Sequence, residues 1–214
     1  MADFPDSAVG RVADAIARDS RVEVASLLRE GADPGAVGSD GASLLEWAIY
    51  HRSRGSFEVL LDAGADVRHT DHAGDTVMHY AAIADDSGYL TELITRGAEV
   101  DIVNRRNGHT PLMDAVMHRR HANIRLLLAA GVDPDRTDHV GDTPLHMAGE
   151  INDYRTIMDL LDAGADPTLN NRQGATFQRY IFMTSAMLLT EHARAERDQI
   201  IGWLREHDIP VESP

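Results

Sequence analysis

The chain has 214 residues, of which 43% are hydrophobic and 26% charged, a composition that excludes a disordered chain and fits one soluble folded domain. Acidic residues outnumber Lys and Arg by 35 to 20, and the net charge of -15 disfavours binding to nucleic-acid phosphates. The longest uncharged apolar run, 180–190, is much shorter than the roughly 20 residues needed to span a bilayer. We therefore expect neither a nucleic-acid nor a membrane partner.

The chain contains no cysteine, which fits a reducing compartment and excludes disulfides and thiolate metal sites. Residues 1–7 include Asp3 and Asp6 and no basic group, so they do not resemble a secretory signal, and we expect a cytoplasmic protein. All 20 basic residues are Arg and none is Lys. Genomic base composition is one explanation; the other is that a chain without side-chain amines escapes isopeptide tagging.

Two glycine ladders run along the chain with a shared period of 33 or 34 residues. Such self-similarity is typical of repeat proteins, in which each unit buries its apolar face against its neighbours. The glycines of the first ladder each open a Gly-Ala-Asp-like tetrad, and those of the second precede a Thr or Ser by two residues. The first ladder is Gly31, Gly64, Gly97, Gly131 and Gly164, and the second is Gly41, Gly74, Gly108, Gly141 and Gly174.

Each repeated unit predicts a helix, a tight turn, a second helix and an extended loop. At Thr143-Pro144-Leu145-His146 a hydroxyl N-cap precedes a proline at the first helical position, where its missing N–H costs nothing. A pair of aliphatic residues such as Leu160 and Leu161 ends each second helix, and the first-ladder glycine supplies a left-handed C-cap. The Asp that follows is expected to hydrogen-bond to amides of the projecting loop.

The residues Thr143 to Ala148 spell Thr-Pro-Leu-His-x-Ala, and on this signature the chain resembles the ankyrin-repeat family. The third and fourth repeats keep most of the signature, whereas the second and sixth depart from it. The resemblance implies an all-α ankyrin-repeat solenoid of about six helix pairs with projecting hairpin loops. It also implies that His79 and His146 are structural and use their rings to hydrogen-bond between neighbouring loops.

The spacing predicts a single ankyrin-repeat domain over 1–214 that ends in two cap repeats, because terminal repeats have one neighbour each. About ten extra residues lengthen the last pair, and we expect both of its helices to be extended, the first over about 176–190. Its apolar side chains are either covered by the longer second helix or exposed for a partner. The predicted segments are an N-terminal cap 1–37, full repeats 38–70, 71–103, 104–137 and 138–170, and an extended C-terminal cap 171–214.

The eleven histidines and the many carboxylates raise the question of metal binding and catalysis. His69 with His72 and His118 with His121 have a spacing that could supply half of a zinc site, but no Cys completes either set. The 24 Asp residues follow the repeat along an open surface, whereas acid-base catalysis needs two carboxylates in different environments within one pocket. We expect no catalytic residues, no metal and no cofactor.

The resemblance implies that a partner binds in a long concave groove, which the loop tips and the exposed faces of the first helices form together. Arg105 and Arg106 are expected at the tip of the longest loop, where they are either solvated or contact a partner. Each apolar position of the set either binds the partner or packs on the adjacent loop. The candidate binding residues are Tyr50, His51, His72, Asp75, Ile83, Arg105, Arg106, His109, Met117, His118, His139, Asp142, Glu150, Ile151 and Arg172.

Three functional hypotheses follow. The first is a non-enzymatic module that binds a basic protein partner, for example as an inhibitor or immunity-type neutraliser of a toxin, since the chain is small and acidic. The second is an adaptor or secreted effector that recruits a cellular factor, to which the absence of Lys is relevant. The third is an enzyme with a site in the C-terminal helix pair, which no motif supports. Oligomeric state stays open.

Overall fold

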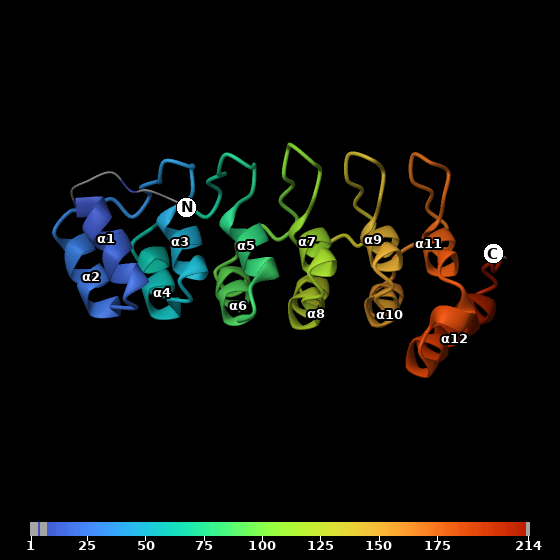
Figure 1. Ribbon diagram of the computed structural model, residues 1–214. Helices are drawn as coiled ribbons and strands as arrows, with labels where there is room; N and C mark the ends of the chain where they lie inside the picture. The colour runs from blue at the N-terminus through green and yellow to red at the C-terminus, as the bar shows by residue number, and fades with distance from the viewer. Residues whose placement is uncertain (1–3, 5–7, 213–214) are drawn as a thin grey trace. The chain divides into compact units, whose positions relative to one another are not determined.

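The computed structural model describes residues 4 and 8–212. These residues form twelve α-helices and one short 3-10 helix, and among them the sole β pairing is an isolated bridge between Val37 and Ser43. The chain divides into two compact units, Met1–Arg106 and Asn107–Pro214, each with three helix pairs (Figure 1). The predicted all-α repeat fold is confirmed; the acidic segment 1–7 lies outside the described residues except for Phe4.

The first unit stacks its helix pairs in chain order. The first helices of the pairs pack side by side, α1 on α3 and α3 on α5, and the second helices do the same, α2 on α4 and α4 on α6. The bounds are α1 Ala8–Ala17, α2 Arg21–Arg29, α3 Leu44–Tyr50, α4 Arg54–Asp62, α5 Val77–Ile83 and α6 Gly88–Thr95.

The second unit repeats this plan, with α7 on α9, α9 on α11, α8 on α10 and α10 on α12. In the described part of the chain, no helix combines the length and apolar character needed to cross a membrane. The bounds are α7 Pro111–Met117, α8 His121–Ala129, α9 Pro144–Glu150, α10 Tyr154–Asp162, α11 Phe177–Met183, the 3-10 helix Ala186–Leu188 and α12 Glu191–Glu206.

The core of each unit is built from the predicted aliphatic pairs and small residues. The first member of every pair is buried, whereas the second is half-buried in three of the five repeats. Ala81 in the first unit, and Ala115 and Ala148 in the second, are fully buried, so the first helices approach closely. The buried leucines are Leu27, Leu60 and Leu93 in the first unit and Leu127 and Leu160 in the second.

The first-ladder glycines end the second helices as predicted. Gly31 has a φ of +101°, in the left-handed region, and its N–H donates to the carbonyl of Leu28 at 3.1 Å. The next amide, that of Ala32, reaches back to Leu27 at 3.1 Å, so two carbonyls at the helix end are satisfied. The same left-handed conformation recurs at each of the other first-ladder glycines.

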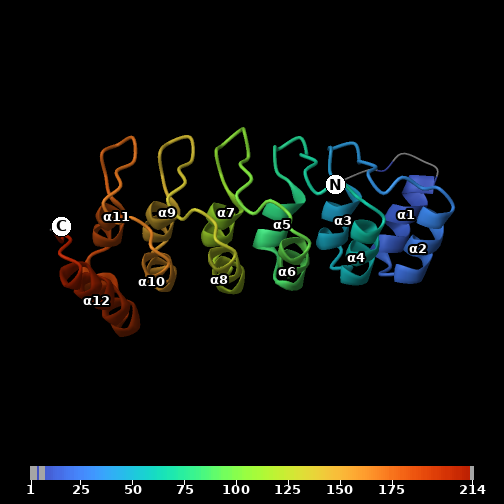
Figure 2. The ribbon, with the colours of Figure 1, turned by 180° about the vertical axis from the view of Figure 1, so that it is seen from behind.

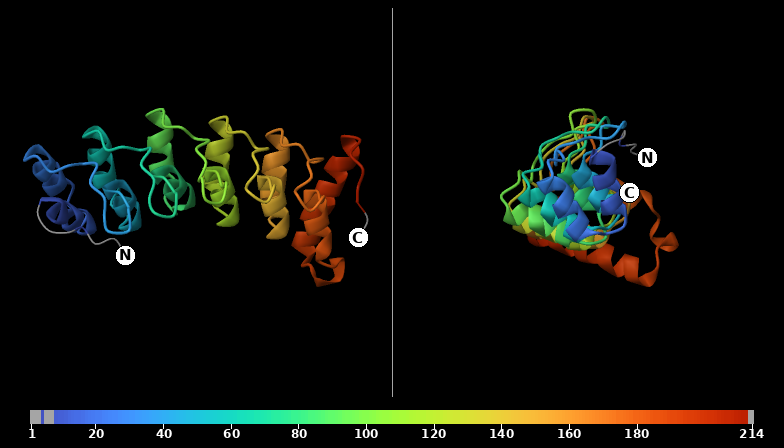
Figure 3. Two further views of the ribbon diagram at one scale, coloured as in Figure 1. Left: turned by 90° about the horizontal axis from the view of Figure 1, so that it is seen from above. Right: turned by 90° about the vertical axis from the view of Figure 1, so that its left-hand side faces the viewer.

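The C-terminal pair differs from the prediction, because only its second helix is extended. The first helix, α11, ends at Met183 and not near residue 190, whereas α12 has 16 residues and is visibly longer than α10 (Figure 3). Arg197 in α12 donates to the carbonyls of Thr184 at 2.9 Å and Ile181 at 3.4 Å. This tertiary contact satisfies carbonyls that a continuing helix would otherwise bond, so α11 can end there.

The apolar side chains of this pair are divided between core and surface. Phe177 and Ile181 in α11 are buried, as are Ile200 and Leu204 in α12. Both predicted alternatives therefore occur: one set of side chains is buried, whereas those at the end of α11 and in the 3-10 helix stay exposed, and α12 packs against α10. Met183, Met187 and Leu188 are 74%, 89% and 80% exposed.

Candidate functional site

The hairpin loops that lead into the first helices, which we call fingers, leave each unit on one side (Figures 1 and 2). Side-chain oxygens brace their tips: Asp71 accepts hydrogen bonds from the amides of Ala73 and Asp75 at 2.8 and 2.9 Å. Asp138 does the same in the second unit. The Asp that follows the first-ladder glycine bonds to loop amides as predicted: Asp33 accepts from the amide of Gly35 and Asp166 from that of Thr168, both at 2.8 Å. The fingers span 31–43 and 64–76 in the first unit and 131–143 and 164–176 in the second, and finger 97–110 is divided between the units.

Neighbouring fingers of the first unit are bonded through predicted binding residues. The amide of His72 donates to the carbonyl of Asp40 at 3.4 Å, and the guanidinium of Arg106 donates to the carbonyl of His72. A Cβ on Gly41 would lie 2.7 Å from the His72 ring, and one on Gly74 would lie 3.1 Å from Cγ of Arg106. His72 and Arg106 are thus brought together and have a structural role.

The second unit repeats this contact. The amide of His139 donates to the carbonyl of Asn107 at 2.9 Å, and that of Arg172 to the carbonyl of Val140 at 3.2 Å. A Cβ on Gly108 or Gly141 would lie 2.7 or 2.9 Å from the backbone nitrogen of the next finger. The second glycine ladder therefore serves finger-to-finger packing as well as the turn, a role that the sequence analysis missed although the fixed interval marks it.

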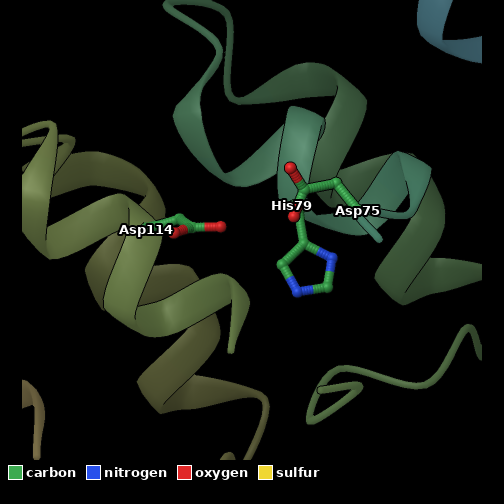
Figure 4. A group of neighbouring side chains, drawn as sticks. All are labelled: Asp75, His79 and Asp114. Atoms are coloured by element: carbon green, nitrogen blue, oxygen red, sulfur yellow. The ribbon is translucent and has the colours of Figure 1, made fainter. Parts of the chain in front are cut away.

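Two predicted carboxylates, Asp75 and Asp142, are also used between fingers. The amide group of Asn104 donates to Asp75 at 2.6 Å, and that of Asn171 donates to Asp142 at 2.6 Å. Both carboxylates are half-buried, and Figure 4 shows Asp75 beside the start of α5. Each therefore has one oxygen engaged within its own unit, which limits what it can offer a partner.

His146 joins the start of α9 to the next finger. Its Nδ1 accepts from the amide of Thr143 at 3.2 Å and lies 2.8 Å from the Thr143 hydroxyl, while Nε2 lies 2.9 Å from the carbonyl of Ala175. Because a carbonyl only accepts, the ring carries its proton on Nε2. His79, in the first turn of α5 (Figure 4), makes the same Nδ1 contacts with Thr76. The predicted bond between neighbouring loops is therefore confirmed for His146.

Aromatic side chains gather at the end of α3. Tyr50 is 68% exposed and stacks on Trp47, with ring centroids 5.7 Å apart and an interplanar angle of 19°. The Trp47 indole donates to the carbonyl of Ala13 at 3.1 Å, which fixes its orientation. The ring of His51 lies against both, and burial lowers the pKa of His51. Trp47 supports this surface, although the sequence analysis did not assign it there.

The side chains at the ends of the other first helices, α5, α7 and α9, differ from one another in exposure. Ile83, at the end of α5, is half-buried, and in the second unit so is Ile151, whose carbonyl accepts from Arg119. Met117 is 40% exposed, and His118 is exposed with its Nδ1 2.9 Å from the carbonyl of Asp114, the α7 residue in Figure 4. Glu150 is exposed. Tyr50, Met117, His118 and Glu150 are thus accessible, and the two isoleucines are less so.

Much of the basic cluster of the fourth repeat is paired within its own unit. In the second unit, Arg125 lies 3.7 Å from Asp159, and His109 lies 2.8 Å from Asp114. In the first unit, Arg105 is exposed and makes no interaction with the described residues. Arg105 in the first unit, and His118 and Arg172 in the second, are therefore exposed basic side chains of the candidate set that are available to a partner.

The histidines with metal-like spacing contact backbone groups and a carboxylate. His69 Nε2 lies 2.7 Å from the carbonyl of Gly41, and the His72 ring lies over the same glycine. In the second unit, His121 Nε2 lies 2.9 Å from Asp153, whereas His118 faces a backbone carbonyl of its own helix.

Comparison with known proteins agrees with this geometry. Protein PhlB of Serratia liquefaciens is 42% identical over 115 residues, which cover 54% of this chain and 51% of that protein. The B-cell lymphoma 3 protein homolog of Mus musculus is 29% identical over 149 residues, covering 68% of this chain and 33% of that protein. This chain thus spans about half of the first relative's length and a third of the second's.

A solved structure shows the same fold. The ankyrin repeat domain of Bcl-3, described as a unique member of the IkappaB protein family, superposes with a TM-score of 0.71 and 20% identity, covering 92% of this chain and 100% of that one. The family model for ankyrin repeats (3 copies) matches residues 45–138 and 78–171. Ankyrin repeats are typical of non-enzymatic protein–protein interaction modules. The protein belongs to the ankyrin-repeat family.

Proposed function

We propose that the finger tips and the exposed ends of the first helices bind a protein partner. The observation that carries this proposal is the exposure of Tyr50, whose ring is held by Trp47 and is 68% accessible. Stacking of the repeats does not require an aromatic group there, since the corresponding α5 residue is Ile83. Exposed, pre-oriented aromatic side chains are frequent among the residues that dominate binding energy at interfaces.

The charge of the chain supports a basic partner. The net charge of -15 extends over both units, and an acidic surface attracts a cationic protein and speeds its association at low salt. The same charge disfavours nucleic acid. Among binding functions, we favour a neutraliser that occupies the active surface of a cationic toxin or enzyme inside the cytoplasm, without catalysing a reaction itself.

One observation favours a second function, that of an adaptor or effector. The chain contains no Lys, so it offers no side-chain amine for isopeptide tagging. An adaptor that recruits a cellular factor would benefit from this composition. The two functions differ in outcome, because a neutraliser abolishes its partner's activity on binding, whereas an adaptor leaves that activity intact.

The test is affinity capture from the native cells with the wild-type chain and with Tyr50→Ala, followed by measurement of Kd for the captured protein. We expect a basic protein that binds the wild type and loses about 30-fold in affinity to Tyr50→Ala, the effect of a hot-spot residue. Val22→Ala is the matched control, because Val22 is an exposed apolar residue on the second helix α2. Unchanged affinity in Tyr50→Ala would overturn the proposed surface.

Charge reversal at Arg105 sharpens the same test. Arg105→Glu changes an exposed finger residue without disturbing a described bond, whereas Arg106→Glu would break the contact with His72. If Arg105 contacts an acidic group of the partner, we expect weaker binding by Arg105→Glu at unchanged thermal stability; long-range attraction to a basic partner alone would strengthen binding. If the partner is basic, association of the wild type slows as salt is raised; a rate independent of salt would contradict that part.

A further inference from the structure

Glu46 is a buried carboxyl group at the joint between two repeats. It is the third residue of α3, the place that His79 and His146 hold in α5 and α9, and it is 3% exposed. The amide of Ser43 donates to its Oε2 at 2.7 Å, and the Ser43 hydroxyl accepts from the Glu46 amide at 3.3 Å. The second oxygen, Oε1, is buried and accepts no hydrogen bond from the residues that the structure describes.

The surroundings do not neutralise a charge on Glu46. The neighbouring carboxylates that act on it, Asp71 and Asp40, are both negative. Burial lowers the pKa of His51, which follows α3, and so disfavours a positive charge there. Other ionisable groups on the elements that pack against α3 are solvent-exposed or bonded elsewhere. Arg11, Asp14 and Arg18 of α1 are exposed, and Arg54 and Glu58 of α4 pair with each other. On the side of α5 and its finger, Tyr80 donates to Asp71, His79 bonds to Thr76, His69 to Gly41, and Asp75 to Asn104.

Comparison with His146 shows what a group at this place does. The Nε2–H of His146 donates forward to the carbonyl of Ala175 in the next finger. By the repeat spacing, the corresponding carbonyl for Glu46 is that of Asp75. A carboxylate has no proton to donate to a carbonyl, whereas a carboxylic acid has one. The forward bond is therefore open to Glu46 only in its protonated form.

We propose that the folded protein holds Glu46 as a neutral carboxylic acid, whose Oε1–H ties α3 to the following finger, so that loss of one proton loosens this joint. The device belongs to the first unit and is independent of any partner. It makes the joint between the second and third repeats sensitive to mild alkali. The joint at His146 instead uses a neutral imidazole N–H as its donor.

The electrostatic consequence has a definite sign. Burial raises the pKa of Glu46 from 4.5 to about 8, with repulsion from Asp71 adding to the rise and the Ser43 bonds opposing it. Between these two values the folded state binds one proton more than the unfolded state. The contribution of Glu46 to stability is therefore complete below the pKa of the unfolded state. As pH rises from that value to the pKa of the folded state, the folding equilibrium constant falls by about tenfold per pH unit.

The experiment compares the wild type with Glu46→Gln, whose amide keeps both a donor and an acceptor at every pH. Both chains carry Trp203→Phe, so that Trp47, beside Glu46, reports the unfolding of the first unit by fluorescence. Folding constants from urea titrations between pH 5 and 8.5 should fall in the wild type relative to Glu46→Gln by about tenfold per pH unit, and level off above pH 8. Glu150→Gln, which changes an exposed carboxylate, should follow the wild type.

Parallel profiles for the wild type and Glu46→Gln would overturn the proposal, because Glu46 would then be ionised throughout. A direct reading uses the wild-type chain alone: the ¹³C shift of the Glu46 carboxyl should change near pH 8, and a change below pH 6 would also overturn it. If Glu46→Gln does not fold, Glu46→His replaces it, because His holds the corresponding place in α5 and α9. That variant should lose the wild type's decline in stability between pH 7 and 8.

Discussion

The junctions that open α3 and α9 share a backbone plan but differ in side-chain chemistry. Each begins with an extended hydroxyl residue, Ser43 or Thr143, followed by a seven-residue helix. In the first unit the Ser43 hydroxyl accepts a helix amide and the Glu46 carboxyl accepts the Ser43 amide. In the second, the His146 ring accepts from Thr143 and also donates to the next finger.

The difference shows that one position serves two neighbours at once. Closing the helix start needs an acceptor, which either a carboxyl or an imidazole nitrogen supplies. Reaching the next finger needs a donor, which the imidazole keeps at neutral pH and the carboxyl has only when protonated. The same fold can thus use either residue, but the Glu46 junction acquires a dependence on pH.

The largest effect should come from the leucine that both junctions share. Leu45 and Leu145 are 0% and 1% exposed, and truncating either to Ala leaves a cavity that we expect to cost about 2–5 kcal/mol. Urea unfolding of Leu45→Ala and Leu145→Ala measures it, with Val22→Ala as the exposed control. A cost below about 1 kcal/mol at one site would show that its junction is not packed as described.

A smaller effect is expected from His146→Ala, which removes the acceptor of the Thr143 amide and the donor to Ala175. Because both partners stay buried, we expect a loss of about 1–3 kcal/mol in the free energy of unfolding. His192→Ala is the control, since its side chain is 85% exposed. Equal stability of the two variants would contradict the bridging role of His146.

The smallest effect concerns the hydroxyl groups. Ser43→Ala removes an acceptor from a helix amide and should cost about 0.5–2 kcal/mol, the usual value of an N-cap. Thr143→Val keeps the branched shape and removes only the hydroxyl contact to the His146 ring, so we expect a smaller loss. Thermal unfolding of both variants gives the order, and a reversed order would show that the two hydroxyls do not differ in role.

Sequence reasoning succeeded where one residue's own geometry dictates the structure. The left-handed conformation at Gly31 and the N-cap at Thr143 follow from local chemistry, and the interval of 33 or 34 residues makes each local inference recur. Reasoning failed at 176–190, because α11 ends where Arg197 bonds its carbonyls, and Arg197 comes from another helix. No local sequence pattern predicts the contact between Arg197 and the end of α11.

The candidate surface divides in the same way. The repeat spacing identified which residues stand on the fingers and at the helix ends, and the exposed Tyr50 is one of them. Whether such a residue is available depends on neighbours one repeat away: Arg106 bonds to His72, and Asp75 to Asn104, while Arg105 is unengaged.

The amino-acid sequence by itself determined the repeat, the helix pairs and the family, because periodic spacing and capping residues act over a few neighbours. Only the tertiary structure decided the protonation state that we expect for the Glu46 carboxyl group. Its 97% burial and the approach of Asp71 arise only when separate repeats pack together. Local chemistry thus determines the secondary structure of each repeat, and packing between repeats determines which of its side chains are buried, charged or accessible.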